Sequence, residues 1–175
     1  MEEKVSGLII SPVSGLEKSA VFKKLSSEIP VVESNNYHGG YLLGEHLKEV
    51  HNAKKAFFNT QEGTKMSSVK ERYEGFKKGF KGQVDILEVD DIENLYDSLF
   101  FCHDLLTLSG MFVLLRNGYK IPEDIRVVSF DDEIVTKYAF PRITTVRQNF
   151  GEIGKDEHIP VELVVRESCR CSFGL

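Results

Sequence analysis

The segment from Gly118 to Asp132 places the strongest constraint on how this chain can fold. Its first residue, a glycine that follows an asparagine, suits the left-handed conformation that ends a helix, and Pro122 stands where a helix cannot continue. The β-branched, apolar run from Ile125 to Phe130 then predicts a strand that is buried on both faces. Ligands of open α/β sheets bind beyond the carboxyl ends of the strands, and Asp131 and Asp132 occupy that position. The sequence therefore predicts a ligand-binding α/β domain.

The length and the net charge of the chain exclude some classes of protein. A chain of 175 residues can bury a core as one domain or as two small lobes. Its net charge of −5 and its scattered lysine pairs argue against a nucleic-acid surface within these residues. There is no apolar run long enough to span a membrane, and Met1 begins a stretch without the basic-then-apolar pattern of a signal peptide. We therefore expect no membrane contact.

The sequence has three cysteines, which is an odd number, and no CxxC motif. We interpret Cys102, which lies in an apolar run, as a buried thiol. Cys169 and Cys171 lie near the C-terminus without the second pair of residues that a common metal site uses, so neither a metal nor a cofactor is predicted there. This cysteine usage favours a reducing, cytoplasmic location.

Strands and helices alternate along the chain in the pattern of βαβ units. A polar loop from Ser34 to Gly40 leads into a helix that ends near His51, and its two glycines allow a close backbone approach. The sequence predicts strands at 5–12, 29–32, 55–59, 84–89, 98–102, 125–130, 143–148 and 159–166. It predicts the other helices at 16–25, 68–80 and 105–117, and the start of one more at Gly151.

The helix near residue 70 has the clearest local signal. Ser68 and Glu71 have the spacing of a capping box, in which each side chain bonds a free amide of the first turn. One apolar stripe is formed by Val69, Tyr73, Phe76 and Phe80. Arg72 then falls in the first turn, where the helix dipole disfavours a cation. Two interpretations of Arg72 remain open: an ordinary surface residue, or a guanidinium that binds a ligand.

Polar residues at the strand ends suggest binding more than catalysis. His103 follows a strand on the expected ligand side, and we expect Asp104 to cap the next helix. Adjacent residues on an extended chain point to opposite sides, so we expect one of Asp131 and Asp132 to face the ligand. A catalytic pair of His103 and Asp131 is disfavoured, because no nucleophile stands in a matching context. The sequence contains no GxSxG, HExxH or phosphate-binding glycine motif, so we predict no enzyme.

Several segments together resemble the effector-sensing core of the lactose/galactose repressor (LacI/GalR) family of bacterial transcription regulators. They are Val5–Pro12, Asn35–Leu47, Ser68–Phe76, Phe101–Leu108, Gly118–Asp132 and Pro141–Gln148. The passage Ile-Pro-Glu-Asp-Ile, continued by Ser-Phe-Asp-Asp and then Ile-Thr-Thr-Val, is the most specific of them.

The resemblance implies a two-lobed, periplasmic-binding-protein-like α/β fold of type I, with parallel sheets flanked by helices. It places residues 1–60 and 147–157 in the N-terminal lobe, and residues 61–146 and 158–175 in the C-terminal lobe. Such a protein closes on a small-molecule effector, usually a sugar or a nucleobase-like compound, and we expect hinges near Asn59 and Gln148.

By position, the resemblance also implies which side chains meet the effector. Arg72 matches an arginine that bonds the effector, and Asp131 matches an aspartate that accepts bonds from its hydroxyls. His103 stands where the family often has a polar side chain, and Asn36 belongs to the loop that faces the ligand. The predicted effector site is therefore Asn36, Arg72, His103 and Asp131.

The sequence departs from the family in ways that affect its partners. The family's helix-turn-helix headpiece is absent, so operator DNA would be bound by a headpiece outside this chain. Compared with the family the chain is shorter between Glu33 and Ser34, near Gly82, and between Lys155 and His158. The first lobe is therefore expected to be incomplete. We predict a homodimeric sensor of a transcription regulator; the alternative is a solute-binding protein of a transport system, which shares the fold.

Overall fold

The computed structural model describes residues 19–28, 33–60, 63–87, 96–149 and 158–169. The predicted strands at 5–12 and 29–32, the helix start at Gly151, and Cys171 lie outside the described residues. None of the helices in the described ranges has the length and apolar character needed to cross a membrane.

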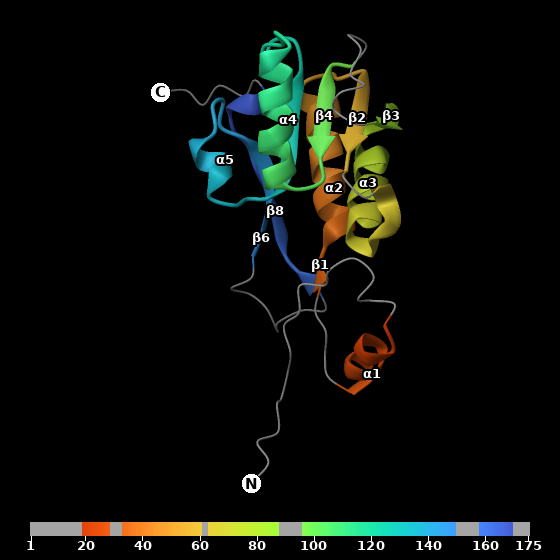
Figure 1. Cartoon of the computed structure of the whole chain (residues 1–175). Coiled ribbons are helices and arrows are strands. Elements are labelled where there is room, and N and C mark those ends of the chain that lie inside the picture. The colour runs from red at the N-terminus through yellow and green to blue at the C-terminus, as the bar shows by residue number, and fades with distance from the viewer. Residues whose placement is uncertain (1–18, 29–32, 61–62, 88–95, 150–157, 170–175) are drawn as a thin grey trace.

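The core of the described structure is a six-stranded, mostly parallel sheet with the order β3-β2-β4-β5-β6-β8 (Figure 1). Only β8, at one edge, runs antiparallel to its neighbour β6. The strand bounds are β2 (Lys55–Asn59), β3 (Gln83–Ile86), β4 (Ser98–Phe101), β5 (Arg126–Asp131), β6 (Thr144–Gln148) and β8 (Val161–Val164). A two-residue strand, β1 (Glu33–Ser34), pairs separately and in parallel with β7 (His158–Ile159). The predicted α/β class with a parallel sheet is confirmed.

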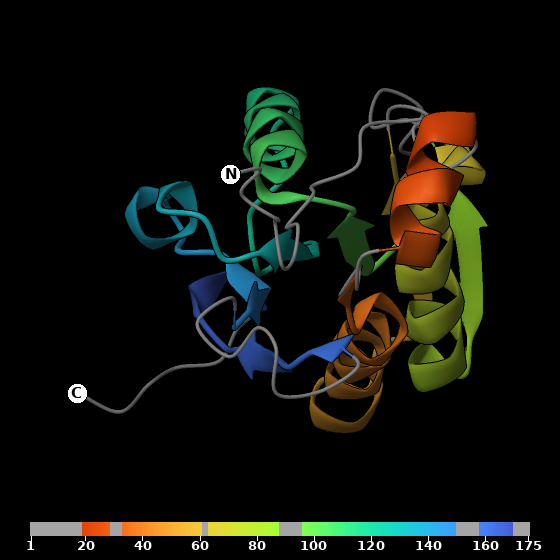
Figure 2. The ribbon, with the colours of Figure 1, turned by 90° about the horizontal axis from the view of Figure 1, so that it is seen from below.

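Helices cover both faces of this sheet, as Figure 2 shows. α2 (Asn36–Glu45) and α3 (Ser67–Phe80) lie on one face, and α4 (Asp104–Arg116) lies on the other. A π-helical turn, η2 (His46–Val50), extends α2. The shorter elements are α1 (Ala20–Glu28), η3 (Gly63–Lys65), α5 (Val135–Tyr138) and η6 (Glu167–Cys169).

The buried interior follows from the apolar runs in the sequence. All of β4 is buried, and the middle of β5 is buried between β4 and β6, as its β-branched composition predicts. Phe76 and Phe80 on the predicted stripe of α3 are fully buried. Each large apolar side chain removed from water in this way contributes about 1.5–3 kcal/mol.

Glycines let α2 and α3 approach more closely than other residues would allow. A Cβ atom added to Gly40 would lie 2.1 Å from the Arg72 carbonyl oxygen, and one added to Gly44 would lie 2.2 Å from the Phe76 oxygen. From α3, a Cβ on Gly75 would lie 1.9 Å from the Tyr37 oxygen. The predicted close approach at the glycine pair is therefore real, but it is made to a helix, and it holds the backbone of Arg72 against α2.

Three local predictions are wrong. The stretch from Asn36 to Gly40 is helix instead of loop, because Asn35 caps α2 by accepting a hydrogen bond from the His38 amide. The predicted capping box at Ser68 does not start α3: the helix begins one residue earlier, after Met66 in extended conformation, with no side-chain cap bond. Asp104 does not cap α4 either.

The cap of α4 is His103, whose Nδ1 accepts a hydrogen bond from the Leu106 amide at 3.2 Å. Asp104 is instead the first residue of the helix and is fully buried.

The predicted division into lobes does not match the sheet. β2 ends at Asn59 and pairs with β3 on one side and β4 on the other, so residues 55–59 belong to the same sheet as the segment after residue 60. α2 packs on α3 and against β6 and β8 of that sheet. A boundary at residue 60 would cut through this packed layer. The two-lobed arrangement itself stays a prediction.

Candidate functional site

The residues predicted to meet an effector come together at the carboxyl edge of the sheet, where β4, β5 and β6 end. Arg72, in the second turn of α3, lies with its Nη2 3.2 Å from Oδ1 of Asp131 at the end of β5. Its Nε donates a hydrogen bond to the Asn36 side-chain oxygen at 2.9 Å. Its Nη1 donates to the Cys102 carbonyl oxygen at 2.6 Å, just beyond β4.

The guanidinium of Arg72 is also fixed by stacking. Its central carbon lies 3.8 Å from the centre of the Phe130 ring, in the geometry of a cation–π contact. Only 12% of the Arg72 side chain is exposed. The sequence left two interpretations of Arg72 open. The ordinary surface residue is wrong, because each of the three guanidinium nitrogens has a partner.

Two residues that the sequence analysis did not assign to the site belong to this group. Gln148, the last residue of β6, donates a side-chain hydrogen bond to Oδ1 of Asp131. Ser34 on β1 donates its hydroxyl to the Gln148 side-chain oxygen, and its carbonyl oxygen accepts a hydrogen bond from the side-chain Nδ2 of Asn36 at 3.1 Å. We call Ser34, Asn36, Arg72, Asp131 and Gln148 the Asp131 cluster. Gln148 could have been found from strand order, since the ends of adjacent parallel strands meet at one edge.

Asp131 is held in an unusual state by the fold. Burial raises the pKa of its carboxyl group, and the nearby Arg72 and His103 oppose this rise only in part. Its backbone has φ of 111° and that of Asp132 has φ of 56°, conformations that non-glycine residues rarely adopt. Such strain costs about 1–3 kcal/mol and concentrates at binding sites.

His103 contributes a neutral ring beside this cluster. Burial lowers the pKa of its imidazole, while its interaction with Asp131 raises it to a lesser degree. Because Nδ1 accepts the bond that caps α4, the proton of the neutral ring lies on Nε2, which makes that nitrogen a donor. The four predicted site residues are therefore neighbours in space, and they offer both donors and acceptors.

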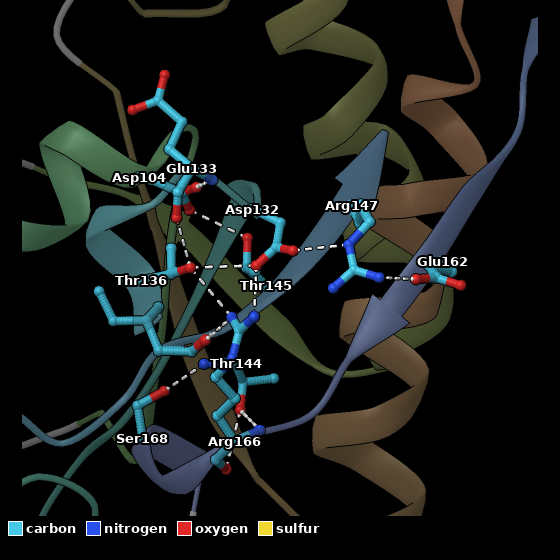
Figure 3. Close-up of polar contacts among 11 residues, drawn as sticks. Asp104, Asp132, Glu133, Thr136, Thr144, Thr145, Arg147, Glu162, Arg166 and Ser168 are labelled. Atoms are coloured by element: carbon cyan, nitrogen blue, oxygen red, sulfur yellow. Dashed lines mark hydrogen bonds and ion pairs between the residues drawn. The ribbon is translucent and has the colours of Figure 1, made fainter. Parts of the chain in front are cut away.

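The adjacent carboxylate, Asp132, points into a different cluster (Figure 3). Its two oxygens accept from Arg166 Nη2 at 2.6 Å and from Arg147 Nε at 2.7 Å, and one of them also accepts from the Thr136 hydroxyl. The side chain is only 2% exposed. Burial alone would raise the pKa of Asp132, but the hydrogen bonds from the two arginines outweigh it and lower the pKa. We call Asp132, Thr136, Arg147 and Arg166 the Asp132 cluster; Arg147 is 41% exposed, whereas the side chains of Asp132 and Arg166 are buried.

A third carboxylate, Asp104, fixes the loop that follows β5. Its oxygens accept hydrogen bonds from the Glu133 amide at 2.7 Å and from the Thr145 hydroxyl at 3.0 Å (Figure 3). Burial raises the pKa of Asp104 to about 7, more than its hydrogen bonds lower it. Asp104 and Asp132 thus hold the turn from which Asp131 projects.

Comparison with known protein families identifies the domain that contains this site. The family model described as "periplasmic binding protein-like domain" matches residues 40–157, most of the described sheet. The chain belongs to this family. The domain spans the carboxyl edge at which Arg72, His103 and Asp131 meet.

Curated relatives of this periplasmic-binding-protein-like chain are regulators. A protein named "HTH-type transcriptional repressor PurR" from Mannheimia succiniciproducens is 25% identical over 151 residues, which is 75% of this chain and 45% of that protein. The protein of the same name from Haemophilus influenzae is 26% identical over 145 residues, 71% of this chain and 43% of that protein. The chain thus spans less than half the length of these relatives. The resemblance to the core of the lactose/galactose repressor family is confirmed.

Solved structures share the fold. A LacI family transcriptional regulator from Enterococcus faecium with bound ribose superposes with a TM-score of 0.74 at 20% identity, covering 94% of this chain and 79% of that one. A periplasmic binding protein/LacI transcriptional regulator from Alkaliphilus metalliredigens, complexed with D-xylulofuranose, gives 0.65 at 21% identity, covering 80% and 65%.

Proposed function

We propose that this chain is the effector-sensing core of a transcription regulator of the lactose/galactose repressor type, and that the Asp131 cluster binds the effector. The observation that carries the proposal is the convergence of Arg72, Asp131 and Gln148 from three separate elements onto one sheet edge. Curated relatives named as repressors favour a regulator over the solute-binding protein of a transport system. A regulator of this kind acts in the cytoplasm and performs no catalysis.

The chemistry of the cluster favours a sugar as the effector. A sugar hydroxyl both donates and accepts, so it needs a carboxylate acceptor such as Asp131 beside donors such as Arg72 and the Gln148 amide. A flat nucleobase would gain from stacking on an aromatic ring, and one face of Phe130 is already covered by the Arg72 guanidinium. Sugars bound to solved structures of similar fold agree with this choice.

The effector would reach the cluster from the side of β1 and β7. Ser34 on β1 is bonded to both Gln148 and Asn36, so a second lobe attached through this short ribbon would close on the Asp131 cluster. We therefore move the proposed hinge from Asn59, which is buried in the sheet, to the β1–β7 pair and Gln148. An effector that prefers the closed state would shift the population of the two arrangements.

An exposed apolar surface on α4 and α5 supports a homodimer. Phe112 is 65% exposed and Tyr138 is 81% exposed. The surface comprises Leu105, Leu108, Phe112, Leu115, Ile134, Tyr138 and Phe140. A face of this kind marks an interaction site, and a second copy of the chain would bring two headpieces, located outside this chain, to a two-fold operator. Phe112→Glu is expected to convert the dimer into monomer in light scattering after gel filtration; an unchanged mass excludes this face.

A thermal-shift screen against monosaccharides, disaccharides and purines tests the effector proposal. A ligand at about a hundred times its dissociation constant adds about 2.7 kcal/mol to the free energy of unfolding. We expect a sugar to raise the melting temperature of the wild type. Asp131→Ala and Arg72→Ala should each weaken its binding by about 1.5–3 kcal/mol, the value of a hydrogen bond to a charged group.

Asp85→Ala provides the matched control, because Asp85 lies on the edge strand β3 and bonds Gln83 and Tyr96 instead of the cluster. The Asp85→Ala protein should bind the effector with the same affinity as the wild type. Full affinity in both Asp131→Ala and Arg72→Ala would exclude the Asp131 cluster. A purine hit without a sugar hit would overturn the choice of effector.

A further inference from the structure

A second group of chemically versatile side chains lies at the opposite end of the sheet from the Asp131 cluster. His46 Nε2 lies 3.4 Å from the Sγ atom of Cys169, and His51 Nε2 lies 3.3 Å from His46 Nε2. One ligand atom from each of the three residues falls within 4.8 Å of the other two. The effector proposal makes no use of this group, which we call the His-His-Cys cluster.

The local fold explains how the two histidines meet. His46 and His51 are five residues apart, a spacing that an ordinary α-helix does not place on one face. The π-helical turn from His46 to Val50 does align them, because its hydrogen bonds connect residues five apart. The two rings meet edge to face with their centroids 5.0 Å apart. Single π turns inside helices are frequent at functional sites.

Cys169 is brought to the histidines by a separately anchored turn. The preceding residue, Ser168, donates its hydroxyl to the Val127 carbonyl, and its backbone amide donates to the Arg142 carbonyl at 3.0 Å. Cys169 is fully buried, and its sulfur lies 3.1 Å from the Thr144 hydroxyl at the start of β6. The thiol is therefore held in place by the sheet and not by the histidines alone.

Two of the three distances between these atoms match the edges of a metal tetrahedron, and the third, between His51 and Cys169, is within 4.8 Å. Zinc binds imidazole nitrogen at about 2.0–2.1 Å and thiolate sulfur at about 2.3 Å, so tetrahedral bonds separate the ligand atoms by about 3.3–3.6 Å. The nitrogen–nitrogen and nitrogen–sulfur distances of 3.3 and 3.4 Å fall within or beside that range. We propose that His46, His51 and Cys169 bind a zinc-class divalent metal ion, with a fourth position left for water or another ligand.

The donor chemistry fits this ion. Imidazole and thiolate ligands suit zinc, whereas magnesium and calcium prefer oxygen. Each imidazole offers one ring nitrogen to the ion, and the Cys169 sulfur is the third ligand atom. Cys169 would bind as thiolate, with its proton released to solvent. The ion would then tie the turn at the end of the described chain to the C-terminal end of α2.

Metal titration of the chain tests the proposal. The protein is stripped with a chelator and titrated with zinc, and separately with cobalt, whose bond to a thiolate gives a charge-transfer absorption band. We expect one ion per chain, a cobalt–thiolate band, and a higher melting temperature in the presence of zinc. Cys169→Ser should lose the band. His51 is half-buried and therefore tolerates substitution better than the fully buried Cys169. His51→Gln should weaken zinc binding by at least about tenfold.

His38→Gln is the matched control, because His38 is exposed near the other end of the same helix. It should bind zinc as the wild type does. The proposal is overturned if stoichiometric binding is absent, or if His51→Gln binds zinc with wild-type affinity. It is also overturned if the band persists in Cys169→Ser and disappears in Cys171→Ser or Cys102→Ser, since the thiolate would then belong to another cysteine.

Discussion

Asp131 and Asp132 are neighbours in the chain, yet the fold gives them opposite tasks. Asp132 is almost fully covered, and the hydrogen bonds from its two arginines lower the pKa of its carboxyl group even though burial alone would raise it. Asp131 remains 24% exposed, has one arginine at 3.2 Å, and has a raised pKa because of its burial. The carboxylate of Asp132 is satisfied by the protein itself, whereas that of Asp131 is the one that we propose binds an effector.

The difference teaches how the neighbours of a carboxylate can fix its position at a sheet edge. Two charge pairs made by Asp132 fix the turn after β5, and Asp104 fixes the next residue through the Glu133 amide. Asp131 is therefore directed at the sheet edge by its neighbours, while its side chain stays 24% exposed. Ligand affinity and fold stability should accordingly depend on different residues of this short segment.

The strongest test of this separation is Arg166→Met. The change leaves Asp132 buried with only Arg147 as a cationic partner, and it removes bonds from Arg166 to Ile143 and Thr136. Breaking a buried ion pair in this way costs about 3–5 kcal/mol in the free energy of unfolding. Urea denaturation measures the loss. The same substitution at Arg142, whose pair with Glu167 is exposed, should cost far less, because exposed ion pairs add little to stability. Equal losses would show that the Asp132 cluster has no special role.

The second test displaces Arg72 without touching any charge. In Gly40→Ala the new methyl group would lie 2.1 Å from the Arg72 carbonyl oxygen, so α2 and α3 must separate. Such overpacking costs about 1–3 kcal/mol of stability. Effector affinity should fall as well, because Arg72 moves relative to Asp131. A variant that binds the effector like the wild type would show that the close helix contact is not needed to position Arg72.

The strands were largely predictable from sequence because their signals are local. Lys55–Asn59 was predicted residue for residue, and the run to Phe130 is as buried as its composition implies. The start of α2 was missed because two adjacent glycines indicate a loop, whereas here they serve tight packing against α3. Propensity is a weak prior when a tertiary contact needs a residue without a side chain.

Only those site residues that the family resemblance pointed to were predicted from the sequence. Asn36, Arg72, His103 and Asp131 do lie together, and their role in effector binding stays a prediction. Gln148 was missed because its place beside Asp131 depends on the pairing of β5 with β6. The His-His-Cys cluster joins residues 123 positions apart, and a local search for ligand spacing cannot detect such a pair.

A third test uses Asp104, the other buried carboxylate of this segment. Its pKa of about 7 in the folded state lies above the usual unfolded value, so the folded protein holds the proton more tightly. Asp104 therefore makes the fold less stable as pH rises between about 4 and about 7, by up to about 1.4 kcal/mol per pH unit. In Asp104→Asn this slope should disappear, while the Thr145 hydroxyl can reverse its hydrogen bond. Parallel stability curves for the two proteins from pH 5 to pH 7 would show that Asp104 does not titrate in this range.

The smallest expected change in stability is that of Asp131→Asn, which tests the difference between Asp131 and Asp132 directly. Asp131 has one arginine at 3.2 Å and its side chain is 24% exposed, so removing its charge should change the free energy of unfolding by less than about 1 kcal/mol. Asparagine also tolerates the positive φ of this position. Asp132→Asn, in contrast, leaves two arginines without their shared anion and should cost several times more. Urea denaturation of both variants measures the difference. If the two losses are equal, Asp131 is as structural as Asp132, and the carboxylate available for an effector must be sought elsewhere.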